Sequence, residues 1–156
     1  MENNKKITGI VNDLIRINND RITGYEKAIE ELKAGDADLQ ALFVRYISES
    51  RQYVTELTHE VTRLGGDPAD GTTNSGKVYR VWMDLKAAIS GQDRQTILNN
   101  CEFGEDAAQK AYDMALNSDA ELEIPLRDLI VKQKAQLKMA HDEVKQLRDL
   151  QKAANP

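Results

Sequence analysis

The 156-residue chain has little cysteine and no long apolar run. Its one cysteine, Cys101, cannot form a disulfide within the chain, and disulfides belong to oxidising compartments, so a reducing compartment is expected. The first residues, Met-Glu-Asn-Asn-Lys-Lys, lack the apolar stretch of a signal peptide, and no segment approaches the length of a membrane span. These absences predict a cytoplasmic protein that does not bind membranes.

Aromatic residues are also scarce, at 5% of the chain, and no segment shows the two-residue alternation of a β-strand. Charged residues reach 30% and apolar residues 40%, a composition typical of a folded helical protein rather than a disordered one. The formal net charge of −5 argues against general affinity for nucleic acid or for anionic membranes.

What the sequence does contain is the periodicity of amphipathic helices, because apolar residues recur at intervals of three and four along most of the chain. A short amphipathic helix is expected over 77–90, after the loop GGDPADGTTNSG. All of these helices are assigned to one domain, residues 1–156. The pattern predicts four long helices, over residues 5–33, 37–64, 92–117 and 122–152.

The lengths of the connections predict the topology. The first two long helices are joined by a short connection, and so are the last two, so each pair should form an antiparallel hairpin. Residues 65–91 are numerous enough to cross the length of the bundle. The second and third long helices should then run parallel. The predicted fold is therefore an all-α four-helix bundle with a fifth, short helix in one long crossover.

Polar residues interrupt the apolar stripe near the middle of each long helix. Burying such groups is costly unless they are paired or hold an ion. The layer is therefore either a structural network of ion pairs and hydrogen bonds, with Arg21 opposite Glu105, or the remnant of a binding site. Its members are Asn18 and Arg21 in the first long helix, Ser50 in the second, Glu105 in the third and Gln133 in the fourth.

Four segments carry a family resemblance: GGDP, RVWMDLKAAISG, CEFGEDAAQKAYDMAL and KMAHDEV. Together they resemble a small bacterial family of ferritin-like proteins that has no assigned function. Two hairpins, a long crossover and polar residues in the middle of the core also resemble the ferritin-like superfamily. This resemblance covers nearly the whole chain and implies a fold, not an activity.

The dinuclear site of that superfamily takes a carboxylate from each of two helices and Glu-x-x-His from each of the other two. In this chain Lys138 puts an ammonium group where the resemblance implies a metal-bridging carboxylate, and an ammonium repels a cation. The corresponding positions are Asp20, Glu56-Leu-Thr-His59, Glu102 and Lys138-Met-Ala-His141.

Helical phase, at about 100° per residue, is a second test of that site. It points Asp20 and His59 away from the apolar stripes, whereas Glu105 and His141 point towards the interior. A complete di-iron site is therefore not predicted, but a partial site for one ion of iron or zinc stays open. Its candidate ligands are Glu105, His141, Glu102 and Glu56.

Three functions remain open. The preferred one is a degenerate ferritin-like protein with a structural or interaction role and no cofactor, because Arg21 and Lys138 bring positive charge to the site. The second is a metal-binding protein with a reduced mononuclear or dinuclear site. The third is a di-iron oxidase or peroxidase-like enzyme. No catalytic residue is predicted, and Cys101 is interpreted as a small core hydrophobe.

The long amphipathic helices also predict a homodimer or a higher oligomer, with Ile15, Ile22 and Val131 as exposed contacts. Light scattering at high protein concentration should give a mass of at least two chains. A monomeric mass under those conditions would contradict this expectation.

Overall fold

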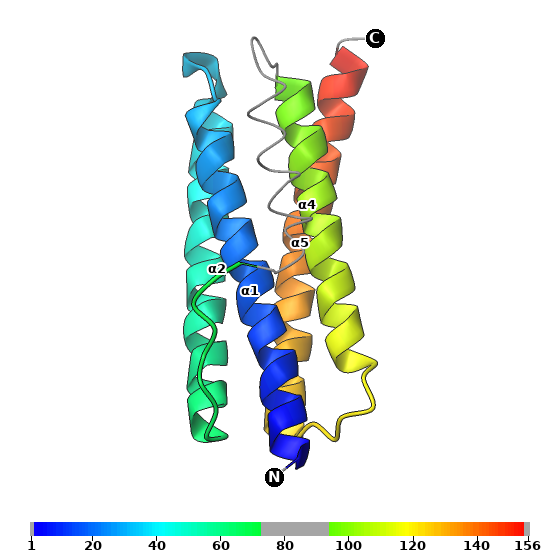
Figure 1. Cartoon of the computed structure of the whole chain (residues 1–156). Coiled ribbons are helices and arrows are strands. Elements are labelled where there is room, and N and C mark those ends of the chain that lie inside the picture. Colours follow the sequence, from blue (N-terminus) through cyan, green and yellow to red (C-terminus); the bar gives the residue numbers. More distant parts are fainter. Residues whose placement is uncertain (1, 73–93, 155–156) are drawn as a thin grey trace.

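The computed structural model describes residues 2–72 and 94–154, and within them all regular structure is helical (Figure 1). The long helices are α1 (Glu2–Glu30), α2 (Ala37–Arg63), α4 (Arg94–Leu116) and α5 (Ile124–Ala154). A short 3₁₀ turn, η1 (Ala34–Asp36), precedes α2. The short helix expected over 77–90 lies outside the described residues. None of the described helices is long and apolar enough to cross a membrane.

The four helices lie side by side as two antiparallel hairpins, α1 with α2 and α4 with α5 (Figure 1). Helices α2 and α4 run in the same direction, as the long connection predicts. Helix α1 packs against both α2 and α4, whereas α2 and α5 make few contacts. The two hairpins therefore meet mainly along α1 and α4.

Local chemistry explains where the helices end. Helix α1 ends at Glu30, before the predicted residue 33, and η1 then turns the chain, closed by a hydrogen bond of 3.1 Å from Lys33 N–H to Asp36 Oδ2. After α2, Gly65 takes a positive φ of 81°, which favours glycine. A Cβ on Gly66 would lie 2.9 Å from Thr8 of α1. The two glycines thus let the chain leave α2 close to α1.

The segment after α2 returns along α1 and is held by two asparagine side chains. Asn12 Nδ2 donates to Asp67 O at 3.0 Å, and Asn12 Oδ1 accepts from Ala69 N–H at 2.8 Å. Further along, Asn19 Nδ2 donates to Gly71 O at 3.0 Å. The start of the crossover therefore runs back beside the bundle, covering part of α1.

Two expectations about α1 are wrong. Asp20, expected to face away from the core, is fully buried, and Ile15, expected to be an exposed contact, is also fully buried. The reason is that α1 is covered on more than one side, by α2, by α4 and by the returning segment. Of the other two contacts expected for an oligomer, Ile22 is half-buried and Val131 is 46% exposed.

The starts of α2 and α4 are joined by an ion pair between the hairpins. Arg94 contacts Asp36 at 3.2 Å and Asp38 at 2.5 Å, and its hydrogen bond to Asp38 is the main reason why the pKa of Asp38 falls to about 2. Because Asp38 is largely exposed, the pair should contribute less than about 1 kcal/mol.

The substitution Asp38→Asn should therefore lower the free energy of unfolding slightly near neutral pH. A carboxylate whose pKa is lowered by folding stabilises the protein above its unfolded pKa, near 3.8, and loses that effect as the pH falls towards 2. Urea denaturation at several pH values should show the difference from wild type shrinking across this window. A difference that stays constant across the window would contradict the assignment.

Candidate functional site

An ion pair between α1 and α4 lies at the middle of the core. Arg21 Nε donates to Glu105 Oε1 at 2.5 Å, and the hydroxyl of Tyr25 donates to the same oxygen at 2.9 Å. Arg21 is 2% exposed and Glu105 is 1% exposed. Burial opposes the charge on Arg21, but Glu105 outweighs that effect, so the pKa of Arg21 is raised. The guanidinium therefore stays charged.

Further groups hold the guanidinium in place. Arg21 Nη1 donates to Ser50 Oγ at 2.8 Å and to the backbone oxygen of Tyr46 at 3.1 Å. Its carbon Cζ lies 5.3 Å from the ring centroid of Tyr25 and 5.0 Å from that of Tyr46, within the range of cation–π attraction. Helices α1, α2 and α4 thus all contribute to fixing this one side chain.

The hydrogen bonds continue from Ser50 to α5. Ser50 Oγ donates to Asn18 Oδ1 at 3.0 Å, Asn18 Nδ2 donates to the hydroxyl of Tyr112 at 2.9 Å, and that hydroxyl donates to Gln133 Oε1 at 2.6 Å. Gln133 Nε2 then donates to Glu56 Oε1 at 3.1 Å. We call the connected set the polar layer: Asn18, Arg21, Ser50, Glu105, Tyr112 and Gln133, with Tyr25 and Glu56 at its ends.

This layer does not fit the dinuclear metal site of ferritin-like proteins. Glu105, its one buried acidic member, is bound to Arg21, and the layer contains no histidine. Arg21 Nη2 and Glu105 Oε2 have no hydrogen-bond partner among the described residues. These two atoms leave some hydrogen-bonding capacity unused, but the permanent charge of the guanidinium repels metal ions. Glu56, a candidate ligand from the sequence, accepts a hydrogen bond from Gln133 instead.

A groove of about 650 Å³ lies between α2 and α5, where the helices make few contacts. On its wall Glu143 accepts hydrogen bonds from the hydroxyl of Tyr46 and, at 2.7 Å, from Arg45 Nη2. Glu49 also lines the groove; burial raises its pKa, and its Oε1 has no hydrogen-bond partner among the described residues. No histidine lines this groove, so it offers no imidazole ligand to a metal ion.

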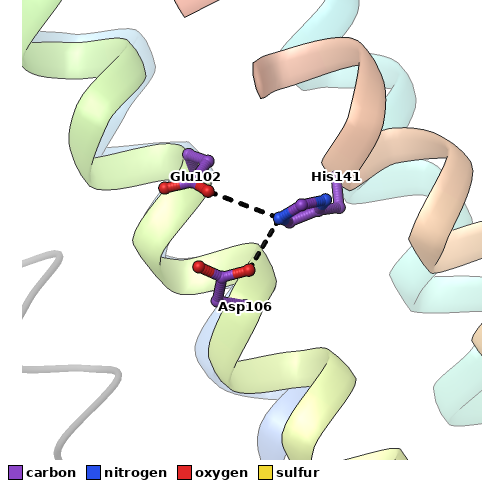
Figure 2. A group of neighbouring side chains, drawn as sticks. All are labelled: Glu102, Asp106 and His141. Carbon is purple, nitrogen blue, oxygen red and sulfur yellow. Dashed lines mark ion pairs between the residues drawn. The ribbon is translucent and has the colours of Figure 1, made fainter. Parts of the chain in front are cut away.

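A second group of polar side chains lies at the α4–α5 contact (Figure 2). His141 Nε2 lies 2.6 Å from Asp106 Oδ1 and 3.4 Å from Glu102 Oε1. On the other side of the ring, His141 Nδ1 lies 3.0 Å from Asp142 Oδ1. We call Glu102, Asp106 and His141 the edge cluster. One potential ligand atom from each residue lies within 4.8 Å of the others.

Electrostatics in the edge cluster favour the protonated ring when no metal is present. Burial opposes protonation of His141, but the hydrogen bond to Asp142 and the charges of Asp106 and Glu102 outweigh it. The pKa of His141 is therefore raised above its ordinary value. Arg148 Nη1 lies 3.1 Å from the outer oxygen of Glu102, Oε2, which leaves Oε1 facing the histidine.

The structure groups the predicted residues differently from the sequence. It separates Glu105, which pairs with Arg21, from His141, which lies at the edge beside Glu102. His59 is exposed on α2. Lys138 faces the surface, where its Nζ lies 2.8 Å from Asp142 Oδ2, so it is not part of the polar layer.

Sequence reasoning missed Asp106. The signal was present, because Glu102 and Asp106 are four residues apart and residues with that spacing share one face of a helix. The candidate ligands came from the dinuclear template and from helical phase, and neither pointed to Asp106.

Over residues 2–72 and 94–154, the fold and the site define a helical bundle with an ion pair buried in its core. Residues 6–118 match the family described as Domain of unknown function (DUF2383). The match spans more than half of the chain, and the protein belongs to this family. No curated protein matches the chain. The family description assigns no activity, so function rests on the residues themselves.

A double-mutant cycle tests the buried pair. The substitution Glu105→Leu should lower the free energy of unfolding by about 3–5 kcal/mol, because it leaves the guanidinium buried without its partner. The single variant Arg21→Met should also be destabilised, because it leaves the carboxylate of Glu105 buried without its partner. The double variant Arg21→Met/Glu105→Leu should lose less than Glu105→Leu alone, because it removes both charges. Chemical denaturation followed by circular dichroism measures all three values.

A surface pair provides the control for this cycle. Arg16 lies 3.0 Å from Asp13, whose side chain is 75% exposed, and Arg16→Met should change stability by less than about 1 kcal/mol. Losses at Arg21 and Glu105 that simply add in the double variant would show that the two charges do not depend on each other.

Proposed function

We propose that this protein is a ferritin-like bundle in which an ion pair fills the place of the central metal site. We propose further that it acts as a structural or interaction module rather than as an enzyme. Two hairpins joined by a long crossover and a polar layer drawn from all four long helices support the ferritin-like assignment. The observation that carries the proposal is the guanidinium of Arg21, bound to Glu105 in the middle of the core.

The charge of Arg21 argues against di-iron oxidase or peroxidase chemistry. Two unit charges about 4 Å apart interact by roughly 4 kcal/mol at an effective dielectric constant of about 20, and a divalent ion doubles that repulsion. The one buried carboxylate that could offset this repulsion in the layer, Glu105, is already bound. The layer therefore serves best to fix how the helices align.

Exposed apolar residues on α5 support the interaction role and the expected self-association. Ile124, Val131 and Met139 are exposed, and their spacing of seven and eight residues keeps them close to one face of the helix. Exposed apolar side chains near one face of a helix can take part in a contact with another protein surface. We propose a second copy of this chain as its partner.

Ferrous iron oxidation in air tests the proposal. Protein purified without a tag should oxidise added ferrous iron no faster than buffer does. The variant Glu105→Gln serves as the matched control, because a di-iron centre in the core would depend on this carboxylate and the amide keeps the shape of the side chain; circular dichroism checks that the variant is folded. Oxidation faster than buffer that is lost in folded Glu105→Gln would overturn the proposal.

A further inference from the structure

The edge cluster has a composition that the polar layer lacks: one imidazole and two carboxylates on facing helices. Glu102 and Asp106 are four residues apart on α4, so both project from one face of that helix (Figure 2). His141 reaches them from α5. A nitrogen and two oxygens from these side chains are ligands that zinc and other divalent transition metals accept.

The imidazole is oriented for binding rather than left free to rotate. Its Nδ1 lies 3.0 Å from Asp142 Oδ1, and a proton on Nδ1 satisfies that hydrogen bond. The other nitrogen, Nε2, points at both carboxylates, and its lone pair is free for a metal ion once the proton on Nε2 has left. A carboxylate behind the ring is the usual partner of a metal-ligating histidine, because it fixes both the tautomer and the ring plane.

Two basic side chains bind one carboxylate oxygen each of Glu102 and Asp142. The other oxygen of each carboxylate is left facing His141. Arg148 binds Glu102 Oε2, and Lys138 binds Asp142 Oδ2. Lys138, which in the sequence argued against a metal site, therefore supports the residue that orients His141.

The Nε2 atom is buried between the two carboxylates, 2.6 Å from Asp106 Oδ1 and 3.4 Å from Glu102 Oε1. The His141 side chain is 15% exposed, whereas Asp106 is 47% exposed, so the cluster opens to solvent beside Asp106. Three converging ligand atoms, one of them a buried imidazole nitrogen, and an open side are what a mononuclear site needs.

We propose that Glu102, Asp106 and His141 bind one divalent transition-metal ion, with water completing its coordination. This site goes beyond the proposed function, and it does not depend on the polar layer. It differs from the partial site expected from the sequence, because Asp106 replaces Glu105 and because the ion binds between α4 and α5 alone. Without metal, a proton on His141 takes the place of the ion.

Cobalt(II) titration tests the site, because cobalt reports its ligands through visible absorption and zinc displaces it. Tag-free protein is stripped with a chelator and titrated with cobalt(II), then with zinc. We expect one cobalt per chain, displaced by one zinc. His141→Ala and Asp106→Asn should each weaken binding by more than about tenfold.

Matched variants separate this site from others on the chain. His59→Ala removes an exposed histidine on α2, and Glu105→Gln removes the charge of the buried carboxylate; both should bind cobalt as wild type does. Circular dichroism checks that each variant is folded, and since Asp106 is half-exposed, Asp106→Asn should fold normally. Failure to bind one cobalt per chain would overturn the site. Binding that survives both His141→Ala and Asp106→Asn would also overturn it.

Discussion

The rest of the structure depends on the ion pair between Arg21 and Glu105. Arg21 belongs to the first hairpin and Glu105 to the second, so their 2.5 Å contact fixes how the two hairpins align along α1 and α4. Any slip of one hairpin would leave a charge buried without its partner, at a cost of about 3–5 kcal/mol. Apolar side chains drive the helices together, and the buried pair adds its own penalty for any register other than the observed one.

Much of this arrangement could be predicted from the sequence, because the helical period is a strong signal. The interrupted stripes held Asn18, Arg21, Ser50, Glu105 and Gln133, which are all buried, but not Asp20, and charge alone suggested Arg21 opposite Glu105. Asp20 and Ile15 were misjudged because the phase of one helix shows its main apolar stripe, but not how many neighbours cover it. Helix α1 has neighbours on several sides, so residues well off the stripe are also buried.

The edge cluster could be predicted only in part. Glu102 and His141 came from a resemblance to a four-helix metal site, which also implied that they would meet residues of the first hairpin. Whether Glu102 and His141 meet the first hairpin depends on how α5 is rotated about its axis relative to α4. The pattern of residues within a single helix does not determine that rotation. That rotation brings His141 to Asp106 and turns Lys138 to the surface, so the cluster uses one hairpin alone. The polar layer and the edge cluster are thus separate features.

A helical bundle with an ion pair at its centre gains a defined register, and the buried guanidinium repels metal ions from that position. The most direct test of this account is the hydrogen-exchange rate of the Arg21 Nε–H proton, measured by NMR on protein labelled with ¹⁵N-arginine. The account predicts a proton protected nearly as well as the backbone amides of the core, beside a fast-exchanging Arg45, whose side chain is 59% exposed. Exchange at Arg21 as fast as at Arg45 would show that the pair is open to water, and would contradict the account.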